Sequence, residues 1–211
     1  MIKAKPGPFV ATIIALNFLV FIALMVTQNT ETGFLYAGFV PVMITAGEWF
    51  TAPVPPILTP VTAAFLHDGP LHIALNMLML FVCGKAVEAA IGWRGAILLY
   101  LVGAYASTAA QWAWDPQSIM PMVGASGAVS AIIGAYAAIF SEQKVAAIGP
   151  IPGHIVRIIW LATAWTVIQA LFGIAFSGAG QGTIAVAAHI GGFIAGILLA
   201  RPMLRWKYRS R

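Results

Sequence analysis

The feature that most constrains this chain is a series of long apolar runs, each about long enough to cross a membrane as a helix. A transmembrane helix needs ~20 consecutive, mostly apolar residues. Six such runs occur, at residues 9–27, 71–91, 95–114, 120–140, 155–176 and 183–200. The composition, 61% hydrophobic and only 8% charged, leaves too much apolar surface for a soluble core. We therefore expect an all-α, polytopic membrane protein with six transmembrane helices.

The basic residues predict how these helices are oriented. All 11 lysines and arginines lie at the two chain ends, or beside the connections between runs two and three and between runs four and five. The remaining connections carry Glu31, Glu48, Asp68 and Asp115 and no basic residue. Because basic side chains stay on the cytoplasmic side, both termini are predicted to be cytoplasmic. This segregation also argues against nucleic-acid binding, despite the net charge of +5.

The domain organisation is expected to be simple. Residues 1–211 are predicted to form a single membrane domain with its core at 49–200. The exterior connection 28–70 is broken by prolines and is expected to lie on the membrane surface or to re-enter it. The exterior segment 177–182 is rich in glycine and has the composition of a mobile lid. The lone Cys83 lies in an apolar run and is interpreted as a packing residue.

Polar side chains from three of the runs are predicted to share one depth. His72 and Asn76 lie four residues apart near the exterior end of run two, on one helix face. Ser126 and His189 each lie about six residues, or ~9 Å, inside the exterior end of runs four and six. Polar groups inside a membrane are costly, so a cluster of them favours a functional site.

Small residues predict that runs four and six pack together. Run four repeats small residues at four-residue spacing from Ser126 to Gly134, and run six carries a G-x-x-x-G motif from Gly192 to Gly196. Such stripes let helix backbones approach closely. This packing would place Ser126 beside His189. The alternative interpretation is that the glycines around Ser126 serve packing alone.

The predicted cluster has the groups that acyl transfer requires. Histidine can take the proton from a serine hydroxyl and so activate it as a nucleophile. His72, the Asn76 amide and free N–H groups at the start of run four can donate hydrogen bonds to a developing oxyanion. No carboxylate lies at this depth, so a Ser–His dyad is expected rather than a triad. His67 is expected to support the adjoining loop.

No metal or cofactor is expected, because His72 and His189 have no acidic or softer partner with which to hold an ion.

The sequence resembles the rhomboid family of intramembrane serine proteases, in its bacterial six-helix form. The resemblance covers residues 49–196, and four motifs carry it: AAFLHDGPLHIALNMLML, GKAVEAAIG, GASG and AHIGGFIAG. It implies a helical bundle around a short fourth helix. It also implies Ser126 as nucleophile and His189 as general base, with His72, Asn76 and Gly124, the first glycine of the G-x-S-G motif, at the oxyanion site.

The resemblance further implies what the protein acts on and where. The partners would be the lipid bilayer and other membrane proteins, cut in or near a transmembrane helix. The location would be a bacterial cell membrane, with the site near its extracytoplasmic face. One alternative within the family is a catalytically silent protein that only binds membrane clients. A transporter is the other alternative, although the polar layer lies near one face rather than at the midplane.

Two positions depart from the family pattern. Trp49 is followed by Phe50 where many members have arginine, and Ser130 stands where many members have an aromatic ring that packs on the histidine. Two explanations for the orientation of His189 stay open: Ser130 hydrogen-bonds it, or a bulkier neighbour replaces the missing ring.

Overall fold

The computed structural model describes residues 6–48, 53–140, 145–176 and 186–209, with no side-chain description for 169–176. Regular structure in these ranges is helical apart from two isolated bridge pairs, which confirms the all-α class. The longer elements are α1 (Pro8–Thr27), α5 (Pro70–Met79), the π-helical η3 (Leu80–Gly84), α6 (Lys85–Trp114), α7 (Ser126–Ile139), α8 (Gly153–Phe176) and α9 (Val186–Arg209). Shorter elements join α1 to α5: α2 (Thr30–Ala37), α3 (Pro41–Thr45), η1 (Pro56–Leu58), α4 (Thr59–Thr62) and η2 (Ala63–Phe65).

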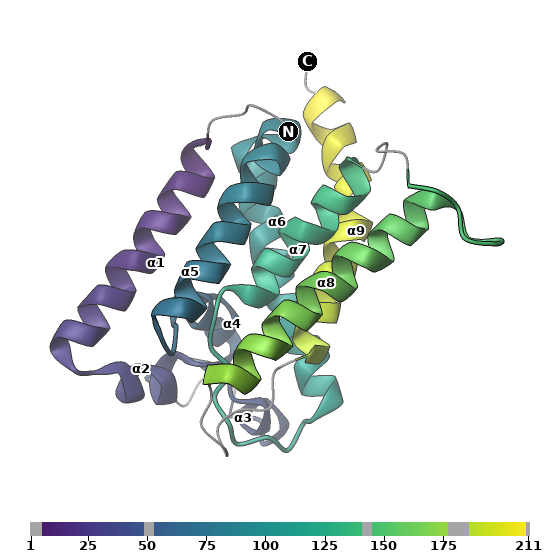
Figure 1. Cartoon of the computed structure of the whole chain (residues 1–211). Coiled ribbons are helices and arrows are strands. Elements are labelled where there is room, and N and C mark those ends of the chain that lie inside the picture. The colour runs from purple at the N-terminus through teal and green to yellow at the C-terminus, as the bar shows by residue number, and fades with distance from the viewer. Residues whose placement is uncertain (1–5, 49–52, 141–144, 177–185, 210–211) are drawn as a thin grey trace.

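Three stretches in the described residues are long and apolar enough to cross a membrane: Pro8–Thr27, the continuous stretch Pro70–Trp114, and Val186–Arg209. The second contains two of the predicted runs. Gly92 separates them with a φ of 80° and a ψ of 162°, a backbone conformation that favours glycine. The chain turns there, so the two runs form separate helical segments of the bundle (Figure 1). Six spans and the orientation of the termini remain predictions.

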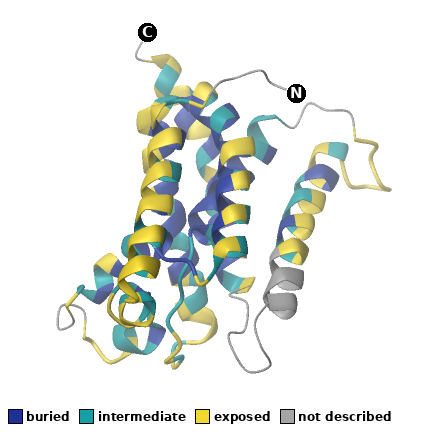
Figure 2. Ribbon diagram, turned by 60° about the vertical axis from the view of Figure 1, so that its left-hand side comes forward, coloured by how far each residue is buried: buried dark blue, intermediate teal, exposed yellow. Residues whose placement is uncertain are grey.

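Helix α7 forms the centre of the bundle. Its residues from Gly127 to Ala135 are all buried, and it packs against α6 and α9 (Figure 2). The contact with α9 is a contact between backbones. A Cβ added at Gly134 would collide with the carbonyl oxygen of Phe193, and one at Gly196 would collide with that of Ala131. The predicted pairing of these two helices is therefore present, and glycine is what allows it.

The predicted run 120–140 is wrong in its first six residues. Helix α7 begins at Ser126, and the residues before it form an extended segment whose Met122 pairs with Phe39. Pro121 disfavours helix at the residue before it, and Gly124 has a φ of 117°, which no helix contains. Of residues 120–125 only Ala125 is buried and Met120 is 55% exposed, so the apolar character of this stretch does not mark a helix. At 14 residues, α7 is only ~21 Å long, shorter than the hydrocarbon core.

The last predicted run, 183–200, also differs from the helix observed. Helix α9 continues to Arg209, through Pro202. Hydropathy falls where basic side chains begin, but the backbone stays helical beyond that point. Residues 183–185 lie outside the described residues.

The exterior connection folds as short helices at the end of the bundle opposite the two termini (Figure 1). Side-chain hydroxyls help to hold it: Thr62 Oγ1 donates to the carbonyl of Ala37 within the connection at 2.7 Å, and Tyr105 OH on α6 donates to the carbonyl of Ile57 in the connection at 3.0 Å. Its predicted interfacial residues Trp49 and Phe50 lie outside the described residues, as does the predicted lid at 177–182.

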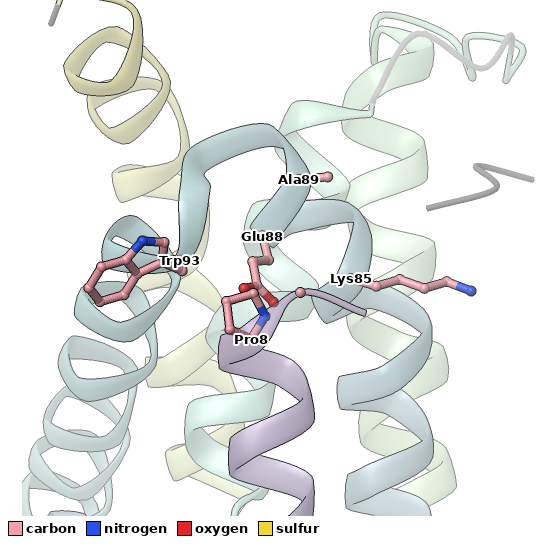
Figure 3. A pocket seen from close by; sticks show the side chains of 6 residues that line it. Pro8, Lys85, Glu88, Ala89 and Trp93 are labelled. Atoms are coloured by element: carbon pink, nitrogen blue, oxygen red, sulfur yellow. The ribbon is translucent and has the colours of Figure 1, made fainter. Parts of the chain in front are cut away.

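A buried carboxylate fastens the start of α1 to α6. Glu88 on α6 accepts hydrogen bonds from the backbone N–H groups of Phe9 at 2.9 Å and Val10 at 3.0 Å. Its side chain points at the beginning of α1, beside a cavity of about 210 Å³ that Pro8 and Lys85 also line (Figure 3). These N–H groups have no acceptor within their own helix, so Glu88 caps α1 from a different helix.

Replacing Glu88 with glutamine should loosen α1. The amide has one acceptor oxygen in place of two and carries no charge, so we expect E88Q to lower the free energy of unfolding by about 1–3 kcal/mol. Denaturation of the purified protein in detergent would measure it. The control is E31Q, at the exposed start of α2. Equal stability of the two variants would show that the Glu88 cap contributes little.

Candidate active site

The structure brings Ser126 and His189 together. Ser126 is the first residue of α7, and His189 lies in the first turn of α9, 5% exposed. The Oγ of Ser126 and the Nε2 of His189 are 2.9 Å apart, within hydrogen-bond distance. The predicted depth of about six residues is wrong for Ser126, because α7 begins at that residue. The predicted start of the run that carries His189 lies outside the described residues. The predicted neighbours are nevertheless correct.

The other nitrogen of His189 has no hydrogen-bond partner among the described residues. No carboxylate of the described chain contacts this histidine. The geometry therefore has the form of a serine–histidine pair without an acidic third member. Since no polar group holds the ring from behind, packing must determine its rotation.

Gly124 and His72 adjoin this pair. A Cβ added at Gly124 would lie 2.6 Å from His72 Nε2 and 3.8 Å from Ser126 Oγ. The backbone of Gly124 thus lies between the imidazole of His72 and the hydroxyl of Ser126, with no side chain there. Its positive φ and this close approach both require glycine.

Asp68 determines how His72 is held. Its Oδ1 lies 2.8 Å from His72 Nδ1, so the carboxylate accepts the Nδ1 proton and the Nε2 side of the ring faces Gly124. The hydrogen bond with His72 lowers the pKa of Asp68 below its usual value. From the sequence alone, Asp68 is identified only as an acidic residue of the connection and is not paired with His72. Its spacing of four residues from His72 is the signal that could have paired them.

Asn76 is fully buried on α5, and its Nδ2 donates to the backbone carbonyl of His72 at 3.1 Å. No hydrogen bond joins it to Ser126 or His189 among the described residues. The amide nitrogen carries two protons, and the Oδ1 atom has no partner in the part of the chain that is described.

His67 supports the turn before α7, as the sequence suggested. Its ring is 2% exposed and packs edge-on against that of His72, with 4.9 Å between ring centroids. The N–H of Ala125 points to its Nε2 at 3.5 Å. Burial lowers the pKa of His67 from 6.5 to about 3, so the ring is neutral and can accept this bond.

Trp165 on α8 is a neighbour of the pair that the sequence did not assign to the site. Its Nε1 donates to Ser130 Oγ at 2.7 Å, and its ring lies 6.3 Å from that of His189, centroid to centroid. Ser130 therefore bonds Trp165 and not the histidine, which excludes the first explanation given above for the orientation of His189. The second explanation, a bulkier neighbour in place of the missing ring, describes the position of Trp165. A contact between helices so far apart in sequence leaves no local signal.

An apolar cavity of about 250 Å³ lies between α8 and α9 and reaches His189. Trp165 and Phe193 line it together with several isoleucines. Among the described residues no group of three or more histidine, cysteine or acidic side chains is placed to hold a metal ion.

These features define a class of protein: a helical membrane protein with a serine–histidine pair where a short central helix begins. Comparison with known proteins gives the family. The Rhomboid domain family matches residues 56–206, and the chain belongs to it.

Three relatives show how far the similarity extends. Rhomboid protease GluP of Bacillus subtilis (strain 168) is 31% identical over 95% of this chain and 36% of its own length. Rhomboid protein 1, mitochondrial, of Saccharomyces cerevisiae is 28% identical over 65% of this chain and 39% of its own. Rhomboid-related protein 2 of Mus musculus is 32% identical over 65% of this chain and 45% of its own length. The chain thus spans less than half the length of each relative.

The buried His67 predicts how stability depends on pH. In the unfolded chain this histidine takes up a proton near pH 6.5, whereas in the fold it stays neutral down to about pH 3. The unfolded state therefore binds more protons between these values, so stability falls as the pH is lowered through this window. H67Q keeps an acceptor but cannot titrate, and should show a shallower decline in denaturation curves. H154Q, at the exposed start of α8, is the control. Parallel declines in H67Q and the parent protein would contradict this account.

Proposed function

We propose that the chain is an intramembrane serine endopeptidase that hydrolyses peptide bonds in or near transmembrane segments of other membrane proteins. The observation that carries the proposal is the 2.9 Å approach of Ser126 Oγ to His189 Nε2 at the start of α7. Membership of the rhomboid family and the similarity to a relative named as a protease support it.

In this mechanism His189 is the general base. Its Nε2 takes the hydroxyl proton while Ser126 Oγ attacks the substrate carbonyl, and the imidazolium then gives that proton to the leaving amine. Water attacks the acyl-enzyme by the same route, with His189 again as base. The reaction proceeds without a carboxylate behind the histidine, so the position of its ring rests on packing.

The oxyanion would be stabilised where α7 begins. The N–H groups of Gly124 and Ala125 are already used, by Ala63 O and His67 Nε2. Those of Ser126 and Gly127 come next and have no acceptor within the first turn of their helix. The positive end of the helix dipole also favours a negative charge there. Because α7 begins at Ser126, both the free N–H groups and the positive end of the helix dipole lie beside the proposed nucleophile.

His72 and Asn76 add side-chain donors in the proposed site. Because Asp68 takes the Nδ1 proton of His72, the ring can donate from Nε2 only when both nitrogens are protonated. Asn76 uses one of its two amide protons on His72 O and retains the other for the oxyanion.

The proposed setting is a single domain with six spans and both termini in the cytoplasm. Lys207 and Arg209 lie in the last turn of α9, whereas Ser126 contacts His189 in the first turn of that helix, so the serine and these basic residues lie at opposite ends of α9. The positive-inside rule then places Ser126 near the extracytoplasmic face of a bacterial cell membrane. A substrate helix must unwind to expose its scissile carbonyl, so substrates with helix-breaking residues near that face are favoured.

The first test is reaction with a small, water-soluble fluorophosphonate. We expect the protein to be labelled, S126A to lose labelling, and H189A to react at least about a thousandfold more slowly. S118A, in the loop before α7, is the matched control and should react normally. Labelling of S126A at the normal rate would exclude Ser126 as the nucleophile.

A folded protein that neither reacts with the probe nor cleaves a transmembrane substrate would instead favour the catalytically silent alternative, a rhomboid-like protein that binds membrane clients. Solute flux in liposomes that persists in S126A would favour the transporter.

A second prediction concerns the carboxylate beside His72. D68N keeps a side chain that can accept the Nδ1 proton but replaces a charge-assisted hydrogen bond with a neutral one, so the His72 ring is held less firmly. We expect kcat/KM for a transmembrane substrate to fall on the order of tenfold. D115N, an exposed acid after α6, serves as the control. Equal rates for the two variants would remove Asp68 from the mechanism.

A further inference from the structure

Trp165 is a buried aromatic residue on α8, a helix whose described side chains are mostly exposed or partly exposed. It is 2% exposed, whereas Trp160 and Ile159, one to two turns earlier on α8, are 70% and 51% exposed. Its indole N–H donates to Ser130 Oγ at 2.7 Å, a bond buried between α8 and α7. The ring is thus fixed by a directional bond as well as by packing.

Ser130 continues this connection to the nucleophile. Its own hydroxyl proton goes to the backbone carbonyl of Ser126 at 2.7 Å, one helical turn earlier. A hydroxyl has one proton to give and accepts with its lone pairs, so the direction is fixed: Trp165 donates to Ser130, and Ser130 donates to Ser126. The side chain on α8 is therefore joined by two hydrogen bonds to the residue that carries the predicted nucleophile.

The same indole adjoins the predicted base. The rings of Trp165 and His189 lie 6.3 Å apart at an interplanar angle of 54°. Both line the apolar cavity between α8 and α9. His189 Nδ1 has no hydrogen-bond partner among the described residues, so its only polar contact there is Ser126 itself. The Trp165 ring, which lies beside His189 at the cavity, is therefore the neighbour that limits rotation of the imidazole.

We propose that Trp165 is a positioning residue for the Ser126–His189 pair and that it makes the alignment of the pair depend on α8 being seated against α7. The proposal rests on the proposed function. Trp165 acts through His189 and through Ser130, without touching the reacting atoms. A displacement of α8 from α7 would carry the indole away and leave His189 free to rotate. Chemistry would then require α8 to be in place.

The test compares Trp165 with Trp160, the same residue type on the exposed face of the same helix. The variants W165A, W165F and S130A are measured beside W160A, using the full chain in proteoliposomes. The soluble fluorophosphonate reports the maximal inactivation rate and, separately, the probe concentration that gives half of it. Because the probe reaches the serine without passing between helices, its rate reports alignment and not lateral access.

We expect W165A to lower the maximal inactivation rate ten- to a hundredfold, in line with the cost of ~1 Å misalignment, with less than a threefold change in the half-saturating concentration. W165F keeps a ring beside His189 and should recover most of this loss. W160A should stay within about twofold of the parent protein. S130A and W165F both remove the same hydrogen bond, so their combined effect should not exceed the larger single effect.

Three results would overturn the proposal. W165A could react with the probe at the same rate as W160A. W165A could cleave a transmembrane substrate faster while its probe rate is unchanged, which would mean that Trp165 only holds α8 closed. The effects of S130A and W165F could multiply, which would mean that the two side chains act separately; this cycle decides the matter if W165A does not fold. In each case Ser126-dependent labelling of the parent protein would leave the proposed function standing, whereas its absence would remove both.

Discussion

The close contact between α7 and α9 is the constraint on which the rest of the structure depends. At Gly134, Gly192 and Gly196 one helix meets backbone oxygen atoms of the other, so no side chain fits between them. Lipid is as apolar as the helix surfaces, so association in a membrane relies on such close packing. This contact fixes the register of the two helices. In that register the first residue of α7 meets the first turn of α9, and Ser126 approaches His189 to 2.9 Å.

Much of this arrangement could be predicted from the sequence, because its determinants are local. Apolar runs give the helices, and small residues at four-residue spacing give the pair that packs most closely. Helix starts could not be predicted in the same way. Residues 120–125 are apolar but form a loop in which only Ala125 is buried, and hydropathy does not distinguish such a loop from a helix. The predicted start of this helix is six residues too early. Only the observed start, at Ser126, shows that the free N–H groups of the first helical turn lie at the serine.

The contacts that sequence reasoning missed join residues distant in the chain. Glu88 caps a helix 78 and 79 residues away, and Trp165 bonds a serine 35 residues away. Neither residue stands in a pattern that reveals its partner. Ser130 was correctly recognised as a departure from the family pattern, yet a small residue at that position says only that space exists. The side chain that fills this space, Trp165, belongs to α8, so the sequence of α7 alone cannot predict it.

Many buried polar groups of this bundle have hydrogen-bond partners, and some do not. Glu88 has both of its oxygen atoms hydrogen-bonded, and the hydroxyls of Ser107 and Thr108 on α6 bond carbonyls of their own helix. Six buried side-chain atoms of the described residues have no partner: three lie around Ser126 (His67 Nδ1, Asn76 Oδ1 and His189 Nδ1), and three lie elsewhere on α1 and α6 (Asn17 Oδ1, Tyr100 OH and Gln111 Oε1). A buried polar atom without a partner costs about 1–3 kcal/mol. The α7–α9 contact can offset such a cost, and a substrate or a water molecule could provide the missing partners. The three atoms near the paired serine and histidine are the ones that bear on the proposed site, because a substrate bound there could supply their partners.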